Sequence, residues 1–429
     1  MQGGNKSRNY LFVLLLLITF ILAGCGRKNV VVNYETQQIA SQQLTFFGYK
    51  HEAVNVEVIE DIMTAFMSDN PDVLVSYESI KGNSYFDALK NRLSSGHLDD
   101  VFMVNHDVVL DFAENNSLAD LSDLLPDINF SENIRSQLAS ADGKIYWLPT
   151  TVSAFGLYCN LDLLAQHGQK VPTNLGEWQA VCDYFVAQGI TPIVANNDIS
   201  LKTLVLAHGF YPLYQEGRQA EAFARLNSGE AKLSDYLADG LLLVKNFCDW
   251  GYVDAAKALN TEKTSDDLAE FVQGKAPFML TGAWAAGRVK GMEPDFAFKV
   301  VPYPILADGS VLIITPDVRL SVSAQCYNPD LAKQFVAFFM QKENLLPLAD
   351  NQASFSPLND EYMPSLTEIH DIVHCYRTQV SVMAADSQIE FPVWNILQNT
   401  VQELLAGEDL AQLTQNMDSA ALAFCQNNT

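Results

Sequence analysis

The chain has 429 residues, and its 51 acidic and 26 basic side chains give a formal charge of −25 at pH 7. A charge of that sign disfavours nucleic acid and anionic lipid as partners, because both are negatively charged. A hydrophobic content of 48% is ample for a packed core. The roughly 385 residues from Leu44 onward exceed one usual domain, so we expect two lobes.

The first 24 residues have the pattern of a secretory signal peptide. Lys6 and Arg8 precede an uncharged run of 13 residues from Leu11 to Ala23. At about 1.5 Å per helical residue, this run is too short for a bilayer core of about 30 Å. We therefore predict a signal peptide over residues 1–24 and not a membrane-spanning helix.

The end of this run resembles the bacterial lipoprotein box, with Ala23, Gly24 and Cys25 in order. The resemblance implies that Cys25 is lipidated and becomes the first mature residue, although an ordinary signal peptide with a chance cysteine is the alternative. A lipid would hold the protein at the outer face of the cytoplasmic membrane without a spanning helix. Residues 25–43 are then expected to form a polar tether. The six other cysteines lie mostly in apolar or helical contexts, so we expect mostly free, buried thiols.

The next hundred residues alternate between strand and helix patterns. Strands are expected at 44–49, 73–80 and 99–105, and helices at 56–67, 84–96 and 108–116. This order predicts an α/β fold with a largely parallel sheet covered by helices. Ligands of such sheets bind beyond the carboxyl ends of the strands, which here are residues 48–52 and 105–107.

Residues 143–164 read as a short strand stopped by Pro149, a second apolar strand and the start of a helix. Beyond them we expect helices at 174–189, 201–208, 220–226, 234–250 and 328–343, and strands at 190–195, 298–306 and 318–325. Trp178 and Trp250 lie at helical spacing among apolar residues, so both are expected in the core.

Six segments, in this order, resemble the extracellular solute-binding proteins of ABC importers, in the branch that includes maltose-binding protein. They are residues 70–107, 143–164, 171–193, 271–290, 329–344 and 393–409, and the resemblance covers essentially all of residues 44–427. It implies a two-lobed periplasmic-binding-protein-like fold with a ligand cleft between discontinuous lobes. The expected lobes are 44–150 plus 304–343 and 151–303 plus 344–429, with hinge crossings near Thr150, near residues 302–304 and within 341–348.

The resemblance also implies a function and a set of ligand-binding residues. A monomer without a cofactor or metal would capture a sugar by lobe closure and deliver it to a membrane permease. A sugar needs a flat aromatic for its C–H face and short polar groups for its hydroxyls. The expected ligand-binding residues are Trp284, Trp394, Asp107, Tyr49, His51, Glu52, Asn105, Ser153, Phe155 and Asp198. Asp107 has an alternative role as the N-cap of the helix that follows it.

One segment departs from the family pattern. Where many members have a glycine-rich stretch, this chain has Pro316, Asp317, Val318 and Arg319. Asp317 and Arg319 either pair with each other, or contact a ligand that carries charge or additional hydroxyls. Both residues are therefore added to the expected ligand-binding set.

The sequence bears on three other functions. The sequence has no G-x-S-x-G, H-E-x-x-H or phosphate-loop motif, so an enzyme is disfavoured. His370 and His374 have the spacing of metal ligands on one helix face, but no third ligand is evident. A charged solute, such as a polyamine or a uronic or phosphorylated sugar, is the main alternative, because fold does not fix the ligand.

Overall fold

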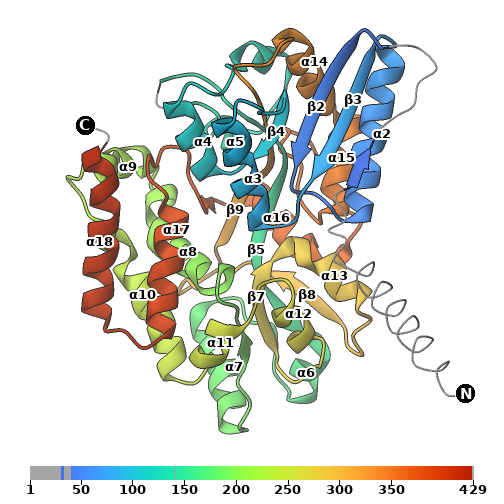
Figure 1. Ribbon diagram of the computed structural model, residues 1–429. Helices are drawn as coiled ribbons and strands as arrows, with labels where there is room; N and C mark the ends of the chain where they lie inside the picture. Colours follow the sequence, from blue (N-terminus) through green and yellow to red (C-terminus); the bar gives the residue numbers. More distant parts are fainter. Residues whose placement is uncertain (1–29, 33–39, 141, 428–429) are drawn as a thin grey trace, which may run out of the picture.

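The computed structural model describes residues 30–32, 40–140 and 142–427 (Figure 1). The expected signal peptide and the lipidation site at Cys25 lie outside these residues. Within the expected tether, Val30–Val32 form strand β1, which pairs antiparallel with β3, and β2 already begins at Gln42. None of the helices in the described part of the chain is long and apolar enough to cross a membrane.

The N-terminal part of the chain confirms the predicted alternation of strands and helices. In order, it forms β2 (Gln42–Gly48), α2 (Ala53–Asp69), β3 (Val73–Ser79), α3 (Asn83–Ser94), β4 (Val101–Val104) and α4 (His106–Glu114). Strand β2 pairs in parallel with both β3 and β4, as the βαβαβ order predicts. Two short helical segments, η1 (Ser122–Asp127) and α5 (Glu132–Arg135), follow.

The prediction that Pro149 ends a strand is wrong. Strand β5 (Leu148–Asn160) runs through Pro149 as one buried element of 13 residues. Proline is tolerated near the start of a strand and at irregular pairings, where its missing N–H leaves no bond broken. Opposite this point in β9 (Leu312–Val322), Val318 has a φ of 44°, and the Thr150 hydroxyl donates to the Val318 carbonyl at 3.1 Å.

A single sheet of the described residues continues through both halves of the molecule. Its strand order is β1-β3-β2-β4-β9-β5-β7-β6, with β10 (Ser381–Met383) beside β9 and β8 (Phe298–Val301) beside β5. The two long strands β5 and β9 pair with each other from Leu148 to Phe155. In Figure 1 they run vertically between the upper part, with β2, β3 and α2, and the lower part, with β7 and α7.

Helices cover the second half of the sheet. The chain adds α6 (Leu161–Gln166), α7 (Leu175–Ala187), β6 (Ile193–Val194), α8 (Ile199–Gln215), α9 (Gln219–Asn227), α10 (Ser234–Asp249), α11 (Ala255–Asn260), α12 (Asp266–Phe271), β7 (Phe278–Gly282), η2 (Ala283–Ala285) and α13 (Ala286–Gly291). The remaining elements are α14 (Pro329–Phe339), α15 (Lys342–Asn351), η3 (Thr367–Ile369), α16 (His370–Thr378), α17 (Val393–Leu405) and α18 (Leu410–Asn427). Proline opens α14, as predicted.

The two tryptophans expected in the core differ in their exposure to solvent. Trp178 is fully buried, as predicted, and packs edge-on to Phe247. The prediction for Trp250 is wrong, because 44% of its surface is exposed. Trp250 is the C-cap of α10, so the helical periodicity that placed it in the core no longer applies where the chain leaves the helix.

The lobe boundaries stay a prediction, but the contacts of helix α15 are relevant to the boundary expected at residue 343. Asn351, at the end of α15, donates from its side chain to the Val54 carbonyl of α2 at 3.0 Å. Helix α15 therefore packs with the first lobe, although the expected boundary at residue 343 would place it in the second. The six cysteines of the described chain are free thiols, and Cys159, Cys182 and Cys375 are buried.

Candidate functional site

Three of the predicted site residues meet at the point where β2, β5 and β9 approach one another. The Asp317 carboxylate accepts a hydrogen bond from the Tyr49 hydroxyl at 2.9 Å and from the Ser153 hydroxyl at 2.8 Å. Burial acts to raise the pKa of Asp317, but Lys50 and hydrogen bonds from Val318 N–H, Ser153 and Tyr49 outweigh it and hold the pKa below 3.8. Asp317 is therefore an anion within the protein, with its charge satisfied by neighbours.

Arg319 does not pair directly with Asp317, so one of the two open interpretations of this segment is wrong. The guanidinium lies 4.2 Å from the centre of the Trp147 ring, and Nε donates to the Pro316 carbonyl at 2.9 Å. Burial lowers the pKa of Arg319 to about 10, against the nearby charge of Asp317. Nη1 is buried without a hydrogen-bond partner in the described structure. In a regular strand these two residues would share one face, but Val318 between them has a φ of 44°, which interrupts the regular alternation of β9.

Three predicted aromatic residues form a second group. The Phe155 ring lies 5.2 Å from that of Trp284 at 79°, and 5.7 Å from that of Trp394 at 41°. Phe155 is buried, whereas both indoles are partly exposed. Trp284 follows Gly282, where an added Cβ would lie 2.3 Å from the indole. Glycine at the end of β7 therefore lets the indole fold back over the strand end. We call these three residues the aromatic cluster.

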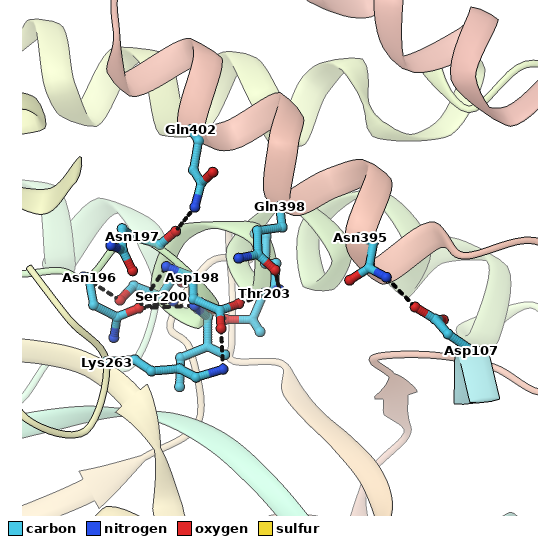
Figure 2. Close-up of polar contacts among 12 residues, drawn as sticks. Asp107, Asn196, Asn197, Asp198, Ser200, Thr203, Lys263, Asn395, Gln398 and Gln402 are labelled. Atoms are coloured by element: carbon cyan, nitrogen blue, oxygen red, sulfur yellow. Dashed lines mark hydrogen bonds and ion pairs between the residues drawn. The ribbon is translucent and has the colours of Figure 1, made fainter. Parts of the chain in front are cut away.

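Asp107 reaches from α4 to helix α17 of the other half of the molecule. One carboxylate oxygen accepts a hydrogen bond from the Asn395 side chain at 2.5 Å, as Figure 2 shows, and the other is buried without a partner in the described structure. Burial raises the pKa of Asp107 above 3.8, although Arg319 and Lys202 oppose the shift. The N-cap role that sequence left open for Asp107 belongs to Asn105, whose side chain accepts from Val108 N–H at 2.9 Å.

Asp198 lies at the N-terminus of α8 and holds two lysines. Its carboxylate pairs with Lys202 Nζ at 2.5 Å. It also pairs with Lys263 Nζ, as Figure 2 shows. The Asn196 side chain accepts hydrogen bonds from the N–H groups of Asp198 and Ile199, which fixes the start of the helix. Burial acts to raise the pKa of Asp198, but the two lysines outweigh it and lower the pKa below 3.8.

Lys202 belongs to the site, and sequence reasoning missed it. Its ammonium lies 3.8 Å from the centre of the Trp394 ring and 3.2 Å from the Gln398 amide oxygen. The signal in the sequence was a single lysine within the apolar stretch 199–207 of a predicted helix. Lysine is almost never fully buried unless it is paired, so its position in this stretch indicates a partner.

His51 and Glu52 make local contacts at the start of α2. His51 Nδ1 lies 3.6 Å from the Glu52 carboxylate, which accepts from the Asn55 side chain at 3.0 Å. Their neighbour Lys50 bonds the side chain of Gln352. Within the described residues, the hydrogen bonds and ion pairs of His51 and Glu52 do not reach the aromatic cluster, so a ligand role for them stays a prediction.

The histidine pair on α16 is not part of a metal centre in the described structure. Among the described residues, no group of three or more His, Cys, Asp or Glu side chains is arranged to hold a metal ion. His370 Nε2 instead lies 2.9 Å from the Pro364 carbonyl.

Comparison with known proteins gives a family match and several curated relatives. The model of the family described as bacterial extracellular solute-binding protein matches residues 61–369. The melibiose/raffinose/stachyose-binding protein MelE of Bacillus subtilis is 23% identical in an alignment of 424 residues that covers 94% of this chain and 94% of its own. A maltooligosaccharide ABC transporter solute-binding lipoprotein of Streptococcus pneumoniae is 22% identical over 80% of this chain and 79% of its own.

Solved structures share the fold. A putative binding protein of Bacillus subtilis in an open conformation superposes with a TM-score of 0.72 and 17% identity, over 91% of this chain and 99% of its own. RafE in complex with raffinose gives a TM-score of 0.67 and 19% identity, over 89% and 99%. A Bacillus licheniformis sugar transporter protein in complex with stachyose gives 0.66 and 21%, over 90% and 99%. The predicted two-lobed α/β fold is thereby confirmed.

Proposed function

This chain belongs to the bacterial extracellular solute-binding proteins, and from that premise we propose that it captures a mono- or oligosaccharide and delivers it to an ABC permease. Relatives named for melibiose, raffinose, stachyose and maltooligosaccharides support the sugar as ligand. They do not favour the alternative of a charged solute such as a polyamine.

The aromatic cluster is the observation that carries this proposal. Two partly exposed indoles, Trp284 and Trp394, flank the buried Phe155 ring. Such rings present apolar faces to the C–H face of a sugar. The unpartnered oxygen of Asp107 and Nη1 of Arg319 supply an acceptor and a donor for hydroxyl groups. Their lack of partners is costly in a buried position, which favours their use by a ligand.

Binding would act by lobe closure. The candidate groups come from both halves of the molecule, with Tyr49 and Asp107 on one side and Asp198, Trp284 and Trp394 on the other. Only a closed arrangement contacts the sugar from both sides, so the sugar favours that state. A lipid on Cys25 would hold the protein near its permease at high effective concentration. In this proposal the protein is a monomer and does no chemistry on the sugar.

Isothermal titration calorimetry of the purified protein with melibiose, raffinose, stachyose and maltotriose tests the proposal. We expect at least one sugar to bind, and Trp284→Ala to weaken it about 10- to 100-fold. Loss of a buried aromatic contact is worth about 1.5–3 kcal/mol, and 1.4 kcal/mol is tenfold in affinity.

Trp250→Ala is the matched control, because Trp250 is exposed on α10 and outside the aromatic cluster. It should leave the affinity unchanged. If no sugar binds while spermidine or a uronic acid does, the carbohydrate function is wrong.

A further inference from the structure

Lys202 lies in a buried environment that is unusual for a lysine. Its side chain is fully buried in α8, and its ammonium lies 3.8 Å from the centre of the Trp394 ring on α17. A cation at that distance over an indole face is attracted by the ring's quadrupole. It also occupies that face, so no sugar can stack there.

The charged and polar groups around this ammonium come from several elements. Asp198, at the start of α8, pairs with it at 2.5 Å and also holds Lys263 from the segment before α12. Gln398 of α17 accepts from it at 3.2 Å. Asp107 of α4 adds a further negative charge nearby. The ammonium is thus shared between an ion pair and the Trp394 ring.

We propose that Lys202 is a positioning residue that fixes the Trp394 indole, leaves one ring face to the sugar and makes sugar affinity depend on pH. The inference rests on the proposed function, because the second ring face is assigned to a sugar. Lys202 itself acts through Trp394 and need not touch the ligand.

The pH dependence has a physical cause. Burial lowers the pKa of Lys202 from 10.5 to about 8, although Asp198 opposes the shift. Below pH 8 the ammonium is charged and held on the indole. As pH rises through 8 it loses its charge, the attraction to the ring face disappears, and the indole gains freedom. A bound sugar must then order that indole, so its affinity falls.

The first experiment needs no sugar. In protein with ¹⁵N-labelled tryptophan, the Trp394 indole N–H signal is assigned with Trp394→Phe and followed from pH 6.5 to 9.5. We expect the signal to shift with a midpoint near pH 8. The shift should be absent in Lys202→Met, which keeps a similar volume without the charge. Lys263→Met is the matched control, because Lys263 also pairs with Asp198 but lies 41% exposed. It should keep the shift, with a midpoint at higher pH, because the charge of Lys263 helps to lower the pKa of Lys202.

The second experiment measures Kd for the bound sugar over the same pH range. We expect the wild type to lose about three- to tenfold in affinity between pH 7 and 9. Lys202→Met should bind weakly at every pH. Lys202→Arg should bind tightly at every pH, because the guanidinium keeps its charge. A purely structural role for Lys202 would not produce this pattern.

The outcomes separate the two proposals. A Trp394 signal that does not titrate near pH 8, or that titrates equally in Lys202→Met, overturns the role of Lys202. A pH-dependent Kd that persists in Lys202→Met overturns it as well. Absence of binding by every sugar, with the Trp394 titration present and lost in Lys202→Met, instead overturns the proposed function and leaves the contact between Lys202 and Trp394 established.

Discussion

At the scale of single residues, the site contains buried charged side chains that are stabilised by different kinds of neighbouring groups. Asp317 is satisfied by hydroxyl and backbone donors, and Lys202 by an ion pair and an indole. Arg319 is only partly satisfied, by an indole and a carbonyl, because its Nη1 has no partner in the described structure. Burying a charge is costly unless it is paired and hydrogen-bonded. Removing one member of such a buried arrangement should therefore destabilise the fold more than removing one member of an exposed ion pair.

Asp317→Asn tests this in strand β9. The substitution keeps the shape but removes the negative charge that Tyr49, Ser153 and Lys50 surround. We expect the free energy of unfolding at pH 7 to fall by about 1.5–3 kcal/mol, the range for hydrogen bonds to charged groups. Urea denaturation measures the change. Asp123→Asn is the control, because Asp123 is 61% exposed in its pair with Lys333, and it should have an effect below about 1 kcal/mol.

The same carboxylate gives a pH dependence of known sign. Since the pKa of Asp317 is lower in the folded protein than its ordinary value of 3.8, its stabilising contribution is complete above that value. It is lost as pH falls through the folded pKa. The stability difference between wild type and Asp317→Asn should therefore shrink below pH 3.8. A difference that stays constant down to pH 2 would contradict the assignment.

At the scale of elements, helices α8 and α10 pack unusually closely because each has a glycine at the contact. A Cβ on Gly240 would lie 2.6 Å from the Val205 carbonyl oxygen, and a Cβ on Gly209 would lie 2.5 Å from the Tyr236 carbonyl oxygen. These are backbone atoms, so the clash cannot be relieved by a side-chain rotation. Helix α8 also carries Asp198 and Lys202, so its distance from α10 bears on the site.

Gly240→Ala should destabilise the protein although alanine is the better helix former. Overpacking costs about 1–3 kcal/mol, against a propensity gain of up to about 1 kcal/mol. Thermal unfolding followed by circular dichroism measures the net loss. Gly287→Ala in α13 is the control, because its Cβ would meet nothing within 4 Å, and it should be neutral or stabilising. Equal behaviour of the two variants would mean that the close contact does not exist.

At the scale of the whole molecule, β5 and β9 pass through both halves and pair with each other. Two paired strands restrict relative motion to a few backbone dihedrals, which is typical of a hinge. The positive φ of Val318 lies in this region, where β-branched residues are strained. Lobe closure on a sugar is therefore expected to be a rotation about these strands rather than a local rearrangement.

Small-angle X-ray scattering tests the closure. The radius of gyration should fall when the wild-type protein is saturated with the sugar identified by calorimetry. Trp284→Ala at the same sugar concentration should show a smaller decrease, because less of it is bound. Saturation of the wild type without any decrease would argue against closure and in favour of binding to a preformed site.

Sequence by itself determined the features that depend on local periodicity and on ordered motifs. The alternation of strands and helices from Gln42 to Glu114, the proline at the start of α14 and the burial of Trp178 all follow from side-chain spacing. The ordered segments also identified the family. These properties need only neighbouring residues, because each element buries one face whatever it packs against.

Tertiary structure decided the features that depend on distant partners. It joined the two expected strands around Pro149 into β5, exposed Trp250, separated Asp317 from Arg319, and placed Lys202 against Trp394. Lys202 and Trp394 lie almost two hundred positions apart in the sequence, and Ser153 and Asp317 lie 164 positions apart. Periodicity shows that a side chain is buried, but its partner is set by which elements pack together. Helix α8 packs on α17 for Lys202 and Trp394, and β5 pairs with β9 for Ser153 and Asp317.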